Sequence, residues 1–290
     1  NKEKMIFDGH AHLFHPKVIL NVKKRIKMVE KIGLKTKGVD NRIGVKPLED
    51  ALKKSGIDGC LILPTAGVHE VGKVNDLFYK TIEKSEFLYT AGTLHPGHLN
   101  NKKELEKFVS RNIKAIKLCS FSQKFVLNGP ETFDLFDLIQ EFNISQGASF
   151  FVVLDTLYGA DLFFGSHPDH NTTPKLLGDL VKSFPAINFI AAHMGGLAAP
   201  FREISSNLTP ADNLFFDTSN AAHVLEEKEF IYLLKSHGPE HIIFGTDWPW
   251  FTHLPEMDLQ NLMFKKAGYS KQDMDLVFSK NMGSLLGILV

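Results

Sequence analysis

The chain has 290 residues, 43% hydrophobic and 23% charged, and its 33 basic residues balance 33 acidic ones. This composition is ordinary for a soluble globular protein, and a net charge of zero gives no reason to expect nucleic acid or an anionic membrane as a partner. No apolar run approaches the ~20 residues that span a bilayer, and we see no signal-peptide core, so we expect a cytoplasmic protein. Cys60 and Cys119 lie in apolar, strand-like runs, where we expect buried, reduced thiols.

The chain opens with a short apolar run, Met5 to Phe7, followed by Asp8-Gly9-His10-Ala11-His12. Side chains two residues apart on a strand point to the same side, so His10 and His12 can reach one point in space. Two neutral imidazoles on rigid backbone suit a metal ion. The alternative is a pair of loop histidines at a strand end, because short motifs of this kind also arise by chance.

A basic and apolar segment, Lys17 to Val45, comes next. Val18, Ile19, Val22, Ile26 and Val29 recur at helical spacing, which predicts an amphipathic helix, whereas the glycine-containing stretch from Lys31 to Val45 is typical of a loop. An insertion directly after the first strand is either a lid over a site at the end of that strand or a solvated excursion.

From Pro47 onward, apolar runs and helical patterns alternate. We expect strands at Gly59–Pro64, Phe87–Leu94, Ile113–Cys119, Ser149–Leu154, Ile187–Ala192, Asn213–Asp217 and His241–Gly245. We expect helices at Pro47–Ser55, Val74–Lys84, Lys102–Ser110, Thr132–Asn143, Pro174–Phe184, Leu197–Asn207, Leu225–Ser236 and within Ser270–Leu289. Eight strand–helix units predict an α/β fold, a (β/α)8 TIM barrel formed by one domain over residues 1–290, with an insertion after strand 1. A doubly wound open sheet is the structural alternative.

Polar residues follow the apolar runs at the ends of the strands, where barrel enzymes carry their chemistry. In chain order they are His10 and His12, Thr65, His95, Lys117 and Ser120, Asp155 and Thr156, His193, Asp217 to Ser219, and Asp247 and Trp248. The set is rich in metal-ligand and acid–base residues, and it predicts a metal-dependent catalytic site.

Three segments together resemble the amidohydrolase superfamily. They are Asp8 to His12, Ala192-His193-Met194-Gly195-Gly196, and Phe244-Gly245-Thr246-Asp247-Trp248-Pro249. The order and spacing are most similar to the amidohydrolase 2 branch, which includes aminocarboxymuconate semialdehyde decarboxylase and its relatives. The resemblance extends over the whole predicted barrel.

The resemblance implies roles for individual residues. His10 and His12 match the H-x-H metal ligands, Asp247 matches an aspartate that binds metal and shuttles a proton, and His193 matches a histidine that is a ligand or a catalytic base. The branch usually has a further ligand histidine after strand five, where this chain has Asp155. A carboxylate can also bind Zn²⁺ or Mn²⁺, so Asp155 is a predicted ligand. His167 and His170, in the loop after strand five, are the alternative ligands.

Lys117 occupies the position at which other branches carry a carbamylated lysine that bridges two metals. In this branch the lysine serves structure or binds a substrate carboxylate, so the resemblance implies one divalent ion, with Zn²⁺ expected and Mn²⁺ the alternative. Lys117 and Arg202 are the predicted cationic contacts of a substrate carboxylate. His95 is a structural residue of the rim or a substrate contact, and Trp248 is a predicted part of the pocket wall.

Three functions are open. The first is a metal-dependent hydrolase of a small-molecule amide, ester or lactone that uses metal-activated water, with Asp247 as the proton shuttle and His193 polarising the carbonyl. The second is a non-oxidative decarboxylase of an aromatic or unsaturated carboxylate, and the third is a non-catalytic ligand-binding barrel. The expected partner is a small-molecule substrate, with no nucleic acid and no membrane, and the resemblance also implies a homodimer as one oligomeric state.

Overall fold

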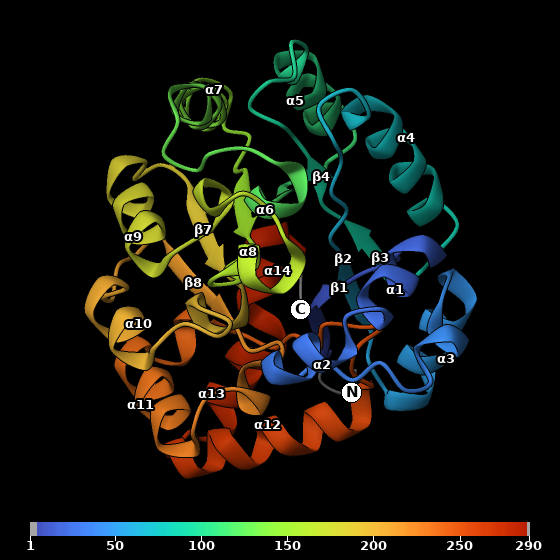
Figure 1. Ribbon diagram of the computed structural model, residues 1–290, viewed down its shortest axis with the longest axis vertical. Helices are drawn as coiled ribbons and strands as arrows, with labels where there is room; N and C mark the ends of the chain where they lie inside the picture. The colour runs from blue at the N-terminus through green and yellow to red at the C-terminus, as the bar shows by residue number, and fades with distance from the viewer. Residues whose placement is uncertain (1–4, 289–290) are drawn as a thin grey trace. The chain divides into compact units, whose positions relative to one another are not determined.

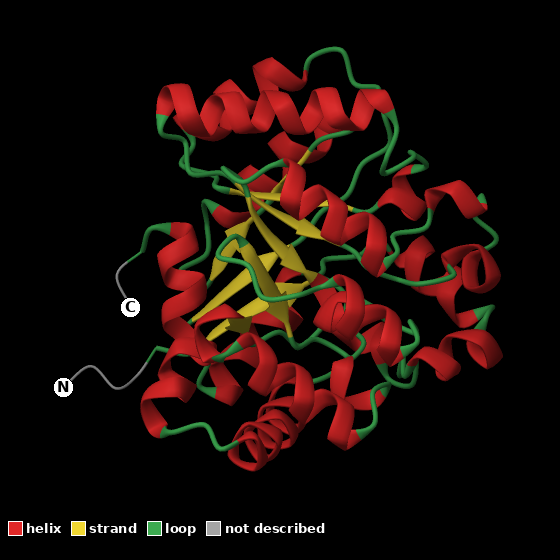
Figure 2. Cartoon of the chain, turned by 90° about the vertical axis from the view of Figure 1, so that its left-hand side faces the viewer, coloured by secondary structure: helices red, strands yellow, loops and turns green. Residues whose placement is uncertain are grey.

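The computed structural model describes residues 5–288, in which β-strands alternate with α-helices along the chain (Figure 1). The chain divides into two compact units. Unit 1 comprises residues 1–62, 85–89 and 216–290, and unit 2 comprises residues 63–84 and 90–215. Helices flank the strands (Figure 2). No helix among the described residues is long and apolar enough to cross a membrane.

Unit 1 is built on parallel strands from the early and the late part of the described residues. β1 (Phe7–Ala11) pairs with β2 (Gly59–Ile62), which is followed in the sheet by β3 (Leu88–Thr90), and β8 (Leu214–Asp217) pairs with β9 (Ile242–Ile243). The amide of Gly9 donates to the Phe244 carbonyl at 2.8 Å, and the amide of Asp247 donates to the His10 carbonyl at 2.8 Å. The end of β1 therefore lies beside the segment that follows β9.

The helices of unit 1 include those of the insertion after β1. They are α1 (Pro16–Lys23), α2 (Ile26–Val29), α3 (Val45–Ser55), α11 (Glu227–His237), α12 (His253–Ala267), α13 (Lys271–Asp275) and α14 (Asn281–Leu286). Local sequence sets several ends: Pro16 is the first residue of α1, Gly56 ends α3 in the left-handed conformation, and Glu226 and Glu229 form a capping box at α11.

Unit 2 contains four parallel strands in sequence order. These are β4 (Gly92–Thr93), β5 (Ala115–Leu118), β6 (Phe151–Leu154) and β7 (Asn188–Ala191). The register places Lys117 opposite Val153 and Leu154 opposite Ala191, so the polar residues after these strands emerge at one edge. The helices are α4 (Val71–Ile82), α5 (Asn101–Ser110), α6 (Ser120–Gln123), α7 (Pro130–Gln146), α8 (Ala160–Phe164), α9 (Pro174–Ser183) and α10 (Phe201–Asn207).

The strands are almost completely buried, as expected of a parallel sheet covered on both faces. Much of the core volume comes from fully buried phenylalanines, and each contributes roughly 1.5–3 kcal/mol by leaving water. In unit 2 these are Phe108, Phe136, Phe142, Phe150, Phe151 and Phe189, and in unit 1 they are Phe7, Phe216, Phe230, Phe244, Phe251 and Phe264.

Several expected elements differ in detail from the structure. The expected strand at Phe87–Leu94 is divided at Ala91 into β3 and β4, and the expected loop after Lys31 contains short 3-10 turns at Glu30–Ile32 and Val39–Arg42. Helix α12 is absent from the sequence-based expectations. The final expected helices end at Leu286, and Leu289 lies outside the described residues.

Candidate metal centre and active-site residues

Three predicted metal ligands meet in unit 1, at the ends of β1 and β9. The Nε2 atoms of His10 and His12 lie 3.1 Å apart, and Asp247 Oδ1 lies 3.8 and 3.5 Å from them. All three residues are buried and form one potential metal-ligand group. Donor atoms that share an ion at about 2.0–2.2 Å are separated by roughly 2.9–3.6 Å, so two of the three separations fit a single bound cation, and the His10–Asp247 separation of 3.8 Å is slightly longer.

The orientation of His10 is set by Asp217 at the end of β8. His10 Nδ1 donates to Asp217 Oδ2 at 2.8 Å, and both side chains are completely buried. The Ser219 amide donates to Asp217 Oδ1 at 3.1 Å, and its hydroxyl donates to the same oxygen. A proton on Nδ1 leaves the lone pair of His10 on Nε2, which is the atom that faces His12. A carboxylate behind a histidine in this way orients the ring and raises its basicity toward a metal.

Asp8 ties the metal-ligand segments together, a role that sequence reasoning missed although the residue belongs to the recognised motif. Its carboxylate accepts from the amides of His10 and Thr246, both at 3.0 Å, and from the Thr246 hydroxyl at 2.5 Å. His253 Nε2, on α12, lies 3.2 Å from Asp8 Oδ2. The sequence did offer a signal for this role of Asp8. The residue lies in a buried strand two positions before His10, and a buried carboxylate needs several hydrogen-bond donors.

Two residues with predicted catalytic roles have a strained backbone. Asp247 has φ of 61° and His193 has φ of 54°, in the left-handed region that L-residues rarely adopt. Such a conformation costs about 1–2 kcal/mol and persists where the surrounding structure fixes it, often at functional sites. In unit 1, Asp247 is fixed by the pairing of its amide with β1, described above.

Aromatic side chains stand next to the metal ligands in unit 1. The His12 ring stacks on Phe14 with centroids 4.5 Å apart, and Phe14 lies 5.6 Å from Trp250. Trp248 stacks on His253 at 5.0 Å, and its buried indole N–H has no hydrogen-bond partner among the described residues. The indole therefore retains a donor for a further group, which agrees with its predicted place in a pocket wall.

Lys117, near the end of β5, lies in unit 2 together with Asp155 and His193, which follow β6 and β7. Asp155 Oδ2 lies 3.8 Å from Lys117 Nζ and 4.0 Å from His193 Nε2. Lys117 is 1% exposed, and its ammonium group has no hydrogen-bond partner among the described residues. The metal-ligand role of Asp155 stays a prediction. In the structure the neighbour of its carboxylate is the Lys117 ammonium group.

His95 uses both ring nitrogens within unit 2. Nδ1 accepts from the Gly97 amide at 3.0 Å, Nε2 donates to the Gln123 carbonyl at 2.9 Å, and burial lowers the pKa of the ring. Gln123 itself was missed: its amide nitrogen donates to the Ala66 and Leu94 carbonyls at 2.9 and 2.8 Å. A substrate contact by His95 stays a prediction and would involve the ring carbons.

The other predicted site residues, Arg202, His167 and His170, do not belong to either of these groups of buried side chains. Arg202 is exposed on α10, so its contact with a substrate carboxylate stays a prediction. His167 is exposed and pairs with Asp169 at 3.5 Å, and no potential metal-ligand group among residues 5–288 contains His167 or His170. Burial raises the pKa of the Cys119 thiol to about 12, so both buried cysteines behave as apolar side chains, as expected.

The alternating fold and the buried His–His–Asp group define a metal-dependent enzyme of the α/β-barrel class. The Amidohydro_2 family model (amidohydrolase) matches residues 100–288, and the chain belongs to this family. The matched region contains Asp155, His193 and Asp247, whereas the H-x-H segment precedes it. The family membership expected from the three motifs is confirmed.

Solved structures with similar folds cover nearly the whole chain. An uncharacterised TIM-barrel protein from Bordetella bronchiseptica is 13% identical, with 98% of each chain covered and a TM-score of 0.73. A dihydroxybenzoic acid decarboxylase from Polaromonas sp. JS666, with manganese and the inhibitor 2-nitroresorcinol, is 14% identical over 98% of this chain and 97% of its own, with a TM-score of 0.70. A probable 2-pyrone-4,6-dicarboxylic acid hydrolase from Acinetobacter baumannii is 15% identical over 98% and 99%, with a TM-score of 0.61. No curated protein sequence matches the chain. The predicted TIM-barrel fold is confirmed.

Proposed function

We propose that the protein is a metal-dependent decarboxylase that removes CO₂ non-oxidatively from an aromatic carboxylate. The observation that carries the proposal is the buried ammonium group of Lys117, which has no hydrogen-bond partner among the described residues and only one carboxylate, Asp155, at 3.8 Å. A buried cation without hydrogen bonds is costly by several kcal/mol. A carboxylate of the substrate would supply the missing acceptor at the carboxyl end of β5.

The donor set of unit 1 fits a divalent cation held by His10, His12 and Asp247. A cation bound there would polarise an oxygen of the substrate and spread the negative charge that develops during the reaction. The sequence favours Zn²⁺, but the carboxylate among the donors also suits the harder ion Mn²⁺, and the similar dihydroxybenzoic acid decarboxylase contains manganese. We therefore propose Mn²⁺ as the resident ion.

Decarboxylation requires one proton and one broken C–C bond. Asp247, in its protonated form, donates its proton to the ring carbon that bears the carboxylate. The bond to the carboxylate then breaks, its electron pair returns to the ring, and CO₂ leaves. In the proposed reaction His193 donates a hydrogen bond to a substrate oxygen. Phe14, Trp248 and Trp250 lie next to the metal ligands of unit 1, and their rings suit an apolar pocket wall.

Hydrolysis of a lactone or related ester is the second candidate. The likeness to a probable 2-pyrone-4,6-dicarboxylic acid hydrolase supports it, and this activity was the first expectation from the sequence. In that reaction Asp247 would take a proton from the attacking water and return it to the leaving oxygen. Lys117 favours decarboxylation over hydrolysis of a neutral amide or ester, which has no charge to pair with a buried cation, whereas a lactone that carries a carboxylate would pair with it equally well.

The Lys117→Met variant tests the proposal. We expect KM for an aromatic carboxylate to rise about 10- to 100-fold, since a hydrogen bond to a charged group contributes roughly 1.5–3 kcal/mol. The variant removes a buried cation that lacks hydrogen bonds but also takes the cationic neighbour from Asp155, so these opposing effects should keep the change in the midpoint of thermal unfolding below about 4 °C.

Lys114→Met, which changes a partly exposed lysine just before the same strand, is the matched control. It should leave KM and stability nearly unchanged. An unchanged KM in Lys117→Met, or a loss of stability without a change in KM, would assign Lys117 a purely structural role and remove the main support for decarboxylation.

A further inference from the structure

The segment that follows β1 has a charge very different from the rest of the chain. Residues 16–46, called here the basic excursion, contain ten Lys or Arg and two Asp or Glu, a net charge of +8. The whole chain is neutral, so the remaining residues carry −8. The proposed reaction uses no residue of this segment.

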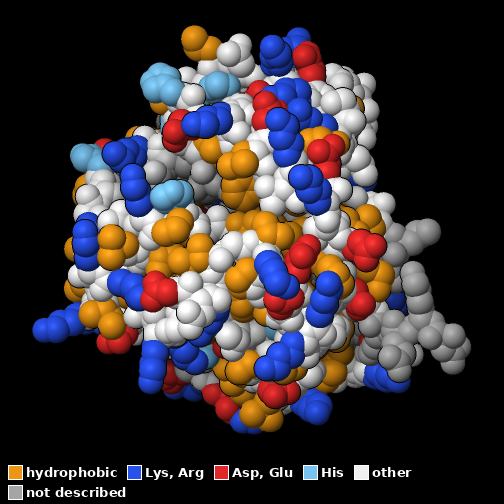
Figure 3. Space-filling model, turned by 90° about the vertical axis from the view of Figure 1, so that its right-hand side faces the viewer, with side chains coloured by type: hydrophobic (Ala, Val, Ile, Leu, Met, Phe, Trp, Pro, Cys, Tyr) orange, Lys and Arg blue, Asp and Glu red, His pale blue; other side chains and the backbone are white. Residues whose placement is uncertain are grey.

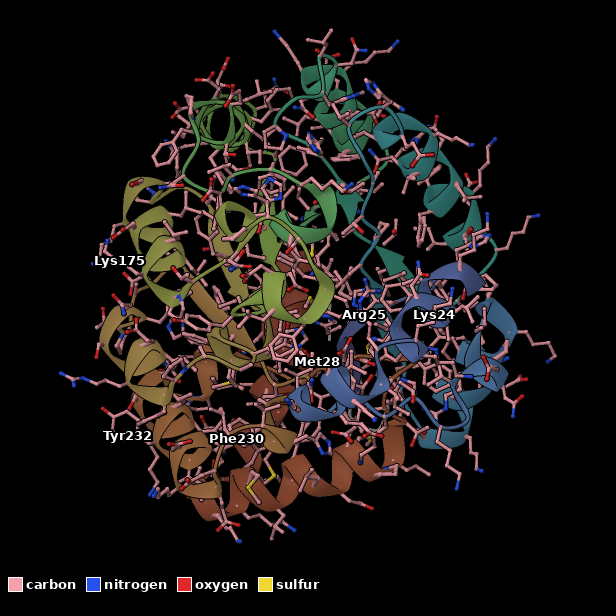
Figure 4. All side chains as sticks on the ribbon, in the orientation of Figure 1. Lys24, Arg25, Met28, Lys175, Phe230 and Tyr232 are labelled. Carbon is pink, nitrogen blue, oxygen red and sulfur yellow. The ribbon has the colours of Figure 1, made fainter. Side chains whose placement is uncertain are left out.

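Most of this charge is directed to solvent. Lys24, Arg25, Lys27, Lys31 and Lys37 are all exposed. In the excursion, Lys23 pairs with Asp40, and Lys46 pairs with Asp50. Among residues 5–288, Lys24, Lys27 and Lys31 have no carboxylate within ion-pair distance. Figure 4 shows Lys24 and Arg25 at the turn between α1 and α2, and Figure 3 shows basic side chains interspersed with apolar ones on one face.

Hydrogen bonds fix the excursion beside the metal-ligand segments of unit 1. Asn220, next to Ser219, donates to the Ile32 carbonyl at 2.8 Å. Arg42 Nη1 donates to the carbonyls of Pro249 and Trp250 at 2.8 and 3.3 Å, just after Asp247. The excursion is thus held at the exits of β8 and β9, and it begins at the exit of β1.

We infer that the basic excursion is an electrostatic guide that selects an aromatic substrate carrying two or more negative charges. The inference rests on the proposed function and narrows its substrate class. The interaction of a fixed positive charge with a ligand grows in proportion to the charge of the ligand. A neutral ligand gains nothing, and a dianion gains twice the free energy of a monoanion, whatever specific contacts each makes.

The size of the effect follows from Coulomb's law. For three unit charges roughly 12 Å from the ligand in water, at an ionic strength of about 0.01 M, neutralisation should weaken binding of a dianion about tenfold and of a monoanion about threefold. At about 0.5 M salt both effects should nearly vanish, because the Debye length then falls below 5 Å.

The test compares two triple variants that remove equal charge. Lys24→Gln/Lys27→Gln/Lys31→Gln changes the excursion. Lys54→Gln/Lys182→Gln/Lys235→Gln changes exposed lysines in the last turns of α3, α9 and α11, which lead toward the starts of strands. The two tryptophans of the chain, Trp248 and Trp250, both follow Asp247, so their fluorescence reports equilibrium binding near the site. The probes are benzene-1,3-dicarboxylate, benzoate and benzamide.

We expect the excursion variant to raise Kd about tenfold for the dicarboxylate, about threefold for benzoate and not at all for benzamide, with less than twofold changes in the control variant. Equal changes for all three probes, no change for the dicarboxylate, or no fluorescence response to any anion would overturn the inference. Loss of binding to phosphatidylserine vesicles with an unchanged Kd for the dicarboxylate would instead make the excursion a membrane-binding surface. The readout needs no turnover, so graded binding supports the inference about substrate charge, whereas the proposed reaction is tested separately by CO₂ release from hydroxylated substrates.

Discussion

Replacing Asp217 by asparagine tests whether the carboxylate behind His10 supports a metal site. The His10–Asp217 hydrogen bond is 2.8 Å long and completely buried, and the Asp217→Asn substitution would keep the size of the side chain but remove its charge. A neutral partner makes His10 Nε2 a weaker donor to a cation. Loss of such a supporting carboxylate typically lowers metal affinity 10- to 100-fold.

The expected result is therefore a Kd for Mn²⁺ or Zn²⁺ that is raised about 10- to 100-fold, or roughly 1.4–2.8 kcal/mol, in a chelator-competition titration. Asp50→Asn is the control, because Asp50 is exposed and pairs with Lys46, four residues away. Equal metal affinities for native protein and Asp217→Asn, with the control unchanged, would refute the reasoning that Asp217 orients a metal-binding histidine.

Three further predictions concern stability and reactivity. Burial lowers the pKa of His237 to about 4, so the imidazole binds a proton more tightly in the unfolded chain than in the folded one. The free energy of unfolding should therefore be highest above pH 6.5 and should fall by about 3 kcal/mol as pH decreases from 6.5 to 4. Urea unfolding across that range should show a smaller pH dependence in His237→Gln, and identical profiles would contradict the assignment. Gly33→Ala should cost about 1–3 kcal/mol in the same assay, because Gly33 has φ of 78° and an added Cβ would lie 2.8 Å from Asn220 Oδ1; unchanged stability would show that the excursion is not anchored there. Cys119, with its pKa raised to about 12, should react with iodoacetamide at pH 7 only after unfolding, and rapid labelling of the folded protein would contradict its burial.

The strand ends were predictable because their signal is local. Each apolar run ends in a polar residue, and chain order alone assigns those residues to the ends of barrel strands. His10, His12 and Asp247 were predicted in this way, and the structure brings them together. The hydrogen bonds that hold these ligand segments in place could not be predicted in the same way. Asp8 and Thr246, for example, are 238 residues apart, and no local sequence pattern relates them.

Helix α12 was missed for a different physical reason. Its buried stripe begins with His253, Glu256 and Gln260, so the apolar periodicity that marks a surface helix is absent from its first two turns. These polar residues are buried because they have partners: Glu256 binds His223 Nε2 at 2.8 Å, and Gln260 donates to the Gly245 carbonyl at 3.0 Å. A helix whose buried face makes polar contacts lacks the apolar periodicity by which helices are recognised in a sequence.

Net charge also concealed a local feature. A total of zero gave no reason to expect nucleic acid or an anionic membrane as a partner, yet it is the sum of a strongly basic excursion and an acidic remainder. Averages over a whole chain exclude only partners that respond to its total charge. A small ligand near the excursion responds to charges within about one Debye length.

The most direct test of the proposed activity is to follow the carboxylate group of the substrate during a reaction in deuterated water. The protein is loaded with Mn²⁺ and incubated with a panel of hydroxybenzoates and hydroxybenzene dicarboxylates, and products are analysed by NMR together with released CO₂. The account predicts one CO₂ per product and one deuterium at the vacated ring carbon, abolished by a chelator and restored by Mn²⁺. No CO₂ from any member of the panel, with metal-dependent opening of a 2-pyrone lactone instead, would contradict decarboxylation and identify a hydrolase.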